Sequence, residues 1–194
     1  MEHSIVLKGR RVTLEPLRVE HAEALAAAIA PDDDVFRWTS TAPRGVAAMR
    51  QWILDRQTDR PAGKAIPFLL RDPENGHVMG STSLFDWSEK DRCAEIGHTW
   101  MVAPFRRSGA NREAKLLLLS HGFEAMGLAR IQIVTDARNT RSREAIAALG
   151  ATFEGILRNH RRDVHGNLRD SPYFSFIDRE WPEAKAALAA KLRP

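Results

Sequence analysis

Two arginines and a glycine stand between a strand-like segment and a helix-like segment, in the run "RRSGAN" at 106–111. Backbone N–H groups at a helix N-terminus lack intrahelical partners, and the helix dipole adds positive potential there. Gly109 lets the chain turn closely enough for several N–H groups to meet one anion, and Arg106 and Arg107 add mobile positive charge. The run predicts a phosphate cradle. Taken alone, it also fits a solvated basic turn with a useful glycine.

Hydrophobic periodicity predicts the elements around this turn. The alternation of apolar residues and the Asn75-Gly76 turn signal indicate strands, and apolar residues at helical spacing indicate helices. The predicted strands are 11–17, 65–72, 77–86, 93–102, 130–137, 153–163 and 167–178. The predicted helices are 19–30, 46–57, 109–126, 140–149 and 181–192. The order β-α-α-β-β-β-α-β-α-β-β, before the last helix, predicts an α/β (α+β) fold. Its mixed central sheet has an antiparallel meander followed by β-α-β crossovers with parallel strands.

Composition narrows the class of protein. A chain of 194 residues with 43% hydrophobic and 28% charged residues is expected to form one domain, residues 1–194. The net charge of +4 is spread along the chain without a basic run, so a nucleic-acid partner is not expected. The single cysteine, Cys93, and the absence of a signal-like or membrane-spanning run favour a cytoplasmic protein with no membrane association. The seven histidines show no metal-ligand spacing, so no metal is expected.

Several segments together resemble the GNAT superfamily of acetyl-CoA-dependent N-acetyltransferases. The turn at 106–111 resembles the family signature Q/R-x-x-G-x-G/A, except that Asn111 occupies its last position. The other matching pieces occur in family order over almost the whole chain: "RVTLEPL", "VMGSTSLFD", "AEIGHTWMVAPFRRSGANREAKLLLL", "NTRSREAIAALGATFEGILRNH" and "GNLRDSPYFSFIDREW". The greatest similarity is to the RimJ/RimL-like branch, which includes the ribosomal-protein N-terminal acetyltransferases. The resemblance implies the GNAT fold and acetyl-CoA as acetyl donor.

The resemblance also implies which residues bind the cofactor. The pyrophosphate of coenzyme A would lie on the turn, whose backbone amides and two arginines would hold it. The pantetheine arm would run beside the preceding strand end, and Asn139 and Ser142 would lie near the thioester, although Asn139 also suits a helix N-cap. The implied cofactor-binding residues are Trp100, Met101, Val102, Arg106, Arg107, Ser108, Gly109, Ala110, Asn111, Asn139 and Ser142.

Transfer to an amine requires a base that removes a proton and a donor near the leaving sulfur. The family's usual tyrosine donor is replaced by Ile146, so the resemblance makes Ser142 the donor candidate. Glu95 and His98 are the candidate bases, on opposite faces of their strand unless the bulge typical of the family changes the phase. Pairing of Glu95 with an arginine, and core packing of His98 beside Ile96 and Trp100, are the structural alternatives.

The acceptor would be a primary amine, on a protein N-terminus or a small molecule, acetylated directly in a ternary complex. In the family, the loop between the first two helices shapes the acceptor pocket, which implies a role for Phe36, Arg37 and Trp38. The segment 158–170 would form the opposite wall. Core packing of the two aromatic residues is the alternative, and a solvated hairpin is the alternative for 158–170. A catalytically silent module that binds acyl-CoA, and a homodimer, also remain open.

Overall fold

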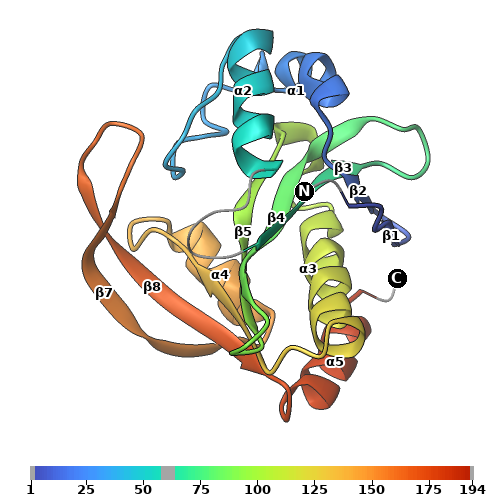
Figure 1. Ribbon diagram of the computed structural model, residues 1–194, viewed down its shortest axis with the longest axis vertical. Coiled ribbons are helices and arrows are strands. Elements are labelled where there is room, and N and C mark those ends of the chain that lie inside the picture. The colour runs from blue at the N-terminus through green and yellow to red at the C-terminus, as the bar shows by residue number, and fades with distance from the viewer. Residues whose placement is uncertain (1–2, 58–63, 193–194) are drawn as a thin grey trace.

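A single eight-stranded sheet crosses the computed structural model, which describes residues 3–57 and 64–192 (Figure 1). The strand order is β1-β2-β3-β4-β5-β6-β8-β7, and every neighbouring pair is antiparallel except β5 and β6. The strands are β1 (Leu7–Lys8), β2 (Thr13–Pro16), β3 (Lys64–Arg71), β4 (Val78–Ser88), β5 (Cys93–Met101), β6 (Arg130–Val134), β7 (Thr152–Arg162) and β8 (Leu168–Ile177).

The helices cover the two faces of the sheet. One hydrophobic cluster joins helices α1 and α2 to one face, and a larger cluster joins α3, α4 and α5 to the other. The α-helices are α1 (Ala22–Ile29), α2 (Gly45–Gln57), α3 (Ala110–Ser120), α4 (Thr140–Ala148) and α5 (Trp181–Ala190). The shorter turns are η1 (Val19–His21) and η2 (Ala103–Phe105), and a π-helical turn η3 (His121–Ala125) extends α3.

The predicted order of elements is confirmed, with two refinements. The strand expected at 11–17 is preceded by the two-residue β1. The crossover from β5 through α3 to β6 is parallel, as predicted. After the second crossover, β7 runs in the same direction as β6, but β8 lies between them and is antiparallel to both.

The two parallel strands pair over only three residues. Cys93, Ala94 and Glu95 are matched with Arg130, Ile131 and Gln132, and β5 continues to Met101 without further pairing to β6. Beyond Glu95 no strand pairs with the β6-facing edge of β5, and we call this separation of the two strands the gap in the sheet. An extended ligand can add to such an edge by main-chain hydrogen bonds.

A bulge in β5 changes which side chains share a face. The register with β4 shifts between Ser81 and Ser83, and His98 has a φ of 49°. Ile96 consequently lies in the α3-side cluster and Trp100 in the α1–α2-side cluster, although strict alternation would place them together. The bulge allowed for in the sequence analysis is present, and the expected face shared by His98 with Ile96 was wrong.

Lys115 of α3 contacts β5 next to this bulge. Its Nζ donates to Thr99 Oγ1 at 2.7 Å and lies 3.4 Å from Thr82 Oγ1. The side chain is only 4% exposed, and burial lowers the pKa of Lys115 to about 7. A neutral amine therefore suits this site better than an ammonium.

We predict that Lys115→Met stabilises the protein most at low pH. In the unfolded chain this lysine stays protonated to about pH 10.5, so wild-type unfolding takes up a proton between about pH 7 and 10.5. Wild-type stability should rise with pH across that window. The variant's advantage, on the order of 3 kcal/mol at pH 6, should shrink as the pH approaches 10.

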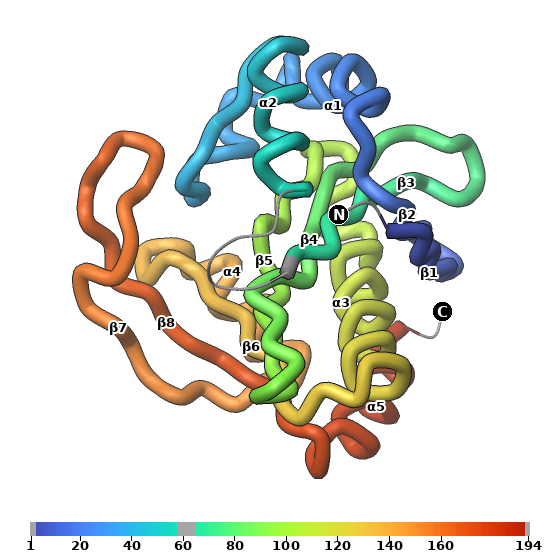
Figure 2. The backbone as a smooth tube through the Cα atoms, viewed as in Figure 1, coloured from blue at the N-terminus to red at the C-terminus, as the bar shows by residue number. Residues whose placement is uncertain are grey.

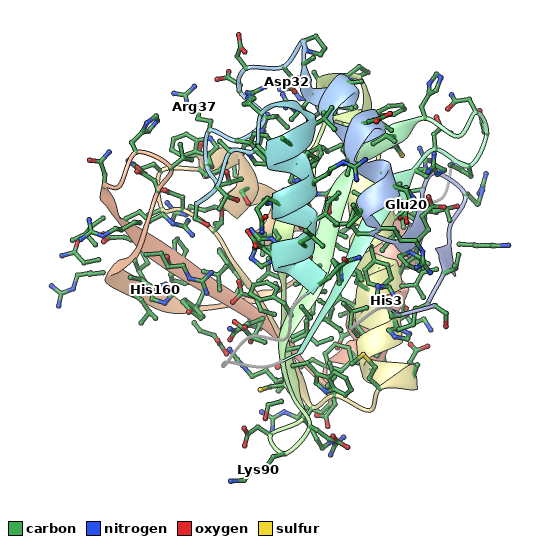
Figure 3. The ribbon with its side chains drawn as sticks, turned by 45° about the horizontal axis from the view of Figure 1, so that its top comes forward. His3, Glu20, Asp32, Arg37, Lys90 and His160 are labelled. Carbon is green, nitrogen blue, oxygen red and sulfur yellow. The ribbon has the colours of Figure 1, made fainter. Side chains whose placement is uncertain are left out.

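Urea unfolding at pH 6, 8 and 9.5 measures this difference. Lys90→Met is the matched control, because Lys90 is an exposed lysine between β4 and β5 (Figure 3). An advantage of Lys115→Met that stays constant over this pH range would contradict a buried neutral lysine.

Candidate functional site

The turn between β5 and α3 presents backbone donors to one side. Arg107 and Gly109 have φ values of 65° and 87°, so the chain reverses in the left-handed region twice before α3 begins. Within residues 3–57 and 64–192, no backbone carbonyl accepts the N–H of Arg107, Ser108 or Gly109. The N–H of Ala110, at the start of α3, donates to Ser108 Oγ at 3.3 Å. The N–H groups of Arg107, Ser108 and Gly109 lie directly before the helix N-terminus, a position that suits a phosphate.

Arg106 and Arg107 differ in their surroundings. Arg106 Nε donates to the carbonyl of Met101 at 2.9 Å, and its guanidinium forms an ion pair with the buried Asp32. Arg106 therefore ties the turn to the connection between α1 and α2, contrary to the expected mobile charge. Arg107 is exposed and is the arginine of the pair whose side chain can follow a ligand.

A third arginine, which the sequence analysis missed, lies at the turn. Arg11 donates from its guanidinium to the carbonyl of Ser108 at 3.2 Å. A Cβ on Gly109 would lie 3.3 Å from Arg11 Cδ, so a side chain there would press on this arginine. The two segments are 97 residues apart, and no local signal connects them.

The buried carboxylate of Glu113 places Arg11 there. It accepts the backbone N–H groups of Arg10, Arg11 and Val12 at 3.1, 2.6 and 3.1 Å. Gly9 makes the approach possible, because a Cβ at that position would lie 2.5 Å from the carboxylate. The first turn of α3 thus holds the chain that enters β2.

Trp100, Met101 and Val102 end β5 beside the gap in the sheet. Met101 pairs with Gly80, and the N–H of Val102 donates to the carbonyl of Met79 at 2.9 Å, so β4 satisfies one edge of this strand end. A Cβ on Gly80 would lie 2.1 Å from the carbonyl oxygen of Trp100, which explains the glycine in this tight pairing. The opposite edge is the one a pantetheine arm could join.

Asn139 and Ser142 begin α4 on the other side of the gap. Asn139 Oδ1 accepts the N–H of Ser142 at 3.1 Å, which confirms the N-cap expected of this asparagine. The cap fixes the first turn of α4 and leaves the half-buried Ser142 hydroxyl at the helix start. The Ser142 hydroxyl at this position could donate a hydrogen bond to a ligand beside α4.

Glu95 lies at the closed end of the gap. Its Oε2 accepts from Gln132 Nε2 at 3.1 Å and lies 3.4 Å from the guanidinium of Arg161, so the expected arginine partner is present. The side chain is 2% exposed, and burial raises the pKa of Glu95 while Arg161 and Gln132 oppose this. A carboxylate whose pKa is moved toward neutrality is suited to accept a proton.

His98 shares the face of Glu95 because of the bulge. Its ring packs against Phe85 at an interplanar angle of 35°, with centroids 4.1 Å apart, and Phe85 is the cross-strand partner of Glu95. The histidine is half-buried, which agrees with the packed role offered as its structural alternative. The structure thus brings both candidate bases to the same side of the sheet.

The three residues of the predicted acceptor loop lie in different settings. Phe36 is 3% exposed and packs edge-on against Trp100, so the core alternative describes it. Arg37 is exposed (Figure 3), and Trp38 is half-buried between the guanidinium groups of Arg37 and Arg138, at 5.1 and 5.6 Å.

Arg138 joins this loop to the β7–β8 hairpin, which extends toward it as a curved arm (Figure 2). Its guanidinium binds Asp136 at 2.8 Å and Asp163 at 3.0 Å. Hydrogen bonds from Arg138 lower the pKa of Asp163 to about 2, and the same carboxylates raise the pKa of Arg138. The two walls expected for the acceptor pocket are therefore connected through Trp38 and Arg138.

A hollow of about 600 Å³ lies on the other side of the strand end, between α1 and the β3–β4 turn. Its lining includes Val102, Phe105 and Asp32 but not Glu95, His98 or Asn139. It is therefore separate from the gap in which the candidate transfer residues meet.

The described residues were also considered as a metal site and as a membrane-spanning segment. They contain no cluster of three or more His, Cys, Asp or Glu arranged to hold a metal ion. None of their helices combines the length and the apolar character needed to cross a membrane.

The fold combines a mixed sheet, a short parallel strand pair and a turn with two left-handed residues before α3, and comparisons identify its family. The family model described as acetyltransferase (GNAT) domain matches residues 11–152. The chain therefore belongs to the GNAT acetyltransferases, as expected, and with it to a class of enzymes.

Individual relatives agree. "Putative ribosomal N-acetyltransferase YdaF" of Bacillus subtilis (strain 168) is 32% identical over 111 residues, which span 57% of this chain and 60% of that relative. A GCN5-related N-acetyltransferase from Brucella melitensis has 31% identity and a TM-score of 0.89 over 99% of this chain and 87% of its own. A crystal structure described as a "putative acetyltransferase" from T. thermophilus has 35% identity and a TM-score of 0.87 over 97% of both chains. The two structures support the fold, and all three likenesses agree with the acetyltransferase family.

We predict that Glu113→Gln lowers stability by about 1–3 kcal/mol. The amide keeps one acceptor oxygen but loses the charge and the second acceptor that serve three backbone N–H groups. Urea unfolding measures the change, with Glu144→Gln on the exposed side of α4 as control. Equal stabilities of the two variants would mean that the Glu113 contacts contribute little.

Proposed function

We propose that this protein transfers the acetyl group of acetyl-CoA directly to a primary amine within a ternary complex. The observation that carries the proposal is the donor-rich turn at 106–111 directly beside the gap between β5 and β6. The turn would bind the pyrophosphate through Arg107, Ser108, Gly109, Ala110 and Asn111. Asn111 keeps its backbone N–H, so the departure from the family signature preserves this donor.

The pantetheine arm would lie along the open edge of Trp100, Met101 and Val102, which points the thioester into the gap. Arg11 would add charge at the turn, and Arg106 would act by holding the turn in place. Asn139 would fix the start of α4, and the Ser142 hydroxyl would donate a hydrogen bond to the departing thiolate, which finally takes up the proton that the amine lost. The roles of Asn139 and Ser142 come from the family resemblance, and that of Arg106 from its contacts with Met101 and Asp32.

In the proposed reaction, Glu95 accepts a proton from the amine as its nitrogen attacks the thioester carbon, and His98 assists on the same face. The tetrahedral intermediate then expels the thiolate, which takes up a proton to give free coenzyme A. Nothing near Cys93 in the sequence marks it as an activated nucleophile, so a direct transfer is favoured over an acetyl-cysteine intermediate.

The acceptor is proposed to be a protein N-terminus or a small-molecule amine. The name of the B. subtilis relative refers to ribosomal acetylation and supports the first class. The chain would act as a single cytoplasmic domain without metal, nucleic acid or membrane, alone or as a homodimer. Release of free thiol from acetyl-CoA in the presence of an amine panel tests the activity. Stabilisation by acetyl-CoA without turnover on any amine would instead support a silent binding module.

We predict that Gly109→Pro abolishes coenzyme A binding. Proline cannot adopt a φ of 87° and lacks the N–H that faces the ligand. Calorimetric titration should show at least about ten-fold weaker binding. Gly109→Ala, which keeps the N–H and costs about 1–2 kcal/mol in backbone strain, should retain measurable binding and shows whether the turn still folds. Unaltered binding by a folded Gly109→Pro would overturn the phosphate assignment.

We predict that kcat/KM falls as the pH drops through the raised pKa of Glu95, because only the carboxylate accepts a proton. Glu95→Gln should lower the rate about 10²–10⁴-fold. Arg161 lowers this pKa, so Arg161→Gln should move the acidic limb to higher pH. If the acidic limb of the pH profile stays at the same pH in Arg161→Gln, or persists in Glu95→Gln, the titrating group is not Glu95.

A further inference from the structure

Arg169 is a buried cation placed directly opposite another cation. It lies in β8, where its cross-strand partner in β7 is Arg161, and it is 9% exposed. Like charges directly opposite in an antiparallel pair destabilise the pairing. A guanidinium has five N–H donors and keeps its charge, so burial there requires compensation by acceptors.

The described residues do not supply that compensation. The nearest carboxylate oxygen, Asp136 Oδ2, is 3.9 Å from Arg169 Nη1, beyond hydrogen-bond distance. Both oxygens of Asp136 already accept from Arg138, at 2.8–3.0 Å. Arg169 Nε is buried and has no hydrogen-bond partner among the residues that the structure describes. Burial lowers the pKa of Arg169, whereas the charges of Asp136 and Glu95 oppose this shift.

A second unpaired polar group lies two residues along the same strand face. The Ser171 hydroxyl is fully buried and likewise lacks a partner in the described residues. The same alternation continues through Tyr173 to Ser175, which is opposite Gln132, the residue that donates to Glu95. Arg169 and Ser171 therefore share the sheet face of the candidate base.

The surroundings identify this face with the acceptor side of the gap. Arg161 connects the opposed arginine pair to Glu95, and the charge of Glu95 acts on Arg169. Arg138, beside Trp38, closes the other side. The turn at 106–111 is held by Arg11 and Asp32, which belong to other elements. The guanidinium of Arg169 is therefore not part of the site proposed for the pyrophosphate.

We propose that the guanidinium of Arg169 forms a carboxylate-binding subsite of the acceptor site, and that the preferred acceptor is an amine with a carboxylate close to it. This inference rests on the proposed acetyl transfer. Glu95 would face the amine end of the acceptor, and Arg169 would face its carboxylate. The opposite charges of these two residues match the opposite charges of such an acceptor. A carboxylate would supply the acceptors that Arg169 lacks.

The carboxylate has two sources that the test must separate. It can be the α-carboxylate of a free amino acid, or an acidic side chain near the N-terminus of a peptide. Each source has an analogue of nearly equal size that lacks the carboxylate charge. For the free amino acid it is the amino acid amide, and for the peptide it is the same peptide with Asn or Gln in place of Asp or Glu. Thiol release from acetyl-CoA is measured with both pairs.

The experiment compares wild type, Arg169→Gln and Arg162→Gln. Arg162 is the control because it lies on the same hairpin, is exposed, and donates to the Gly166 carbonyl. Wild type and Arg162→Gln should favour the charged member of at least one pair by about ten-fold or more in kcat/KM. Arg169→Gln should lose that preference and keep its rate with the neutral member.

A thermal-shift series provides a readout that does not need turnover. With coenzyme A present, the preferred carboxylate compound should raise Tm in wild type and not in Arg169→Gln. Without ligand, Arg169→Gln should match or exceed wild type in Tm, since the replaced guanidinium has no carboxylate within hydrogen-bond distance. A purely structural ion pair with Asp136 predicts the reverse, a loss of stability.

The outcomes separate the two proposals. Acetylation of charged and neutral acceptors at equal rates in wild type, or a preference that persists in Arg169→Gln, would overturn the subsite and leave the acetyl transfer intact. The absence of product with every amine would overturn the proposed function and the subsite with it.

Discussion

The short pairing of β5 with β6 is the constraint on which the rest of the site depends. Three matched residues hold the strands together at Glu95, and beyond them β5 follows its own course through a bulge at His98. A continuous sheet would satisfy every backbone group and leave no room for a ligand. The separation leaves one strand edge unpaired, directly beneath the start of α3.

Both ends of this opening are held by contacts between distant segments. At the mouth, Glu113 holds the chain around Arg11, and Arg106 binds Asp32, so α3 and its preceding turn keep a fixed position. At the bulge, Lys115 of the same helix donates to Thr99. One helix therefore positions both the proposed phosphate cradle and the strand beside the proposed transfer site, at the energetic cost of a buried amine.

The acceptor side is built differently, from charges instead of backbone donors. Arg138 unites two carboxylates and contacts Trp38, whereas Arg169 remains without an acceptor on the same sheet. Arg138 is therefore hydrogen-bonded to two carboxylates, whereas the buried Arg169 has no carboxylate within hydrogen-bond distance. The charges on this side of the protein are unevenly compensated. Such unevenness is expected where a ligand completes the arrangement.

The sequence by itself determined the element order, the family and the position of the turn, because periodicity, turn residues and the run "RRSGAN" are local signals. It also indicated Glu95, His98 and the Asn139 cap. It did not reveal Arg11 at the turn, Arg106 bound to Asp32, or Arg169 opposite Arg161 and on the face of Glu95. Those contacts join residues up to 97 positions apart, and only the packing of the elements and the strand register bring them together. Tertiary structure alone decided them, since a one-residue change in strand register moves every following side chain to the other face.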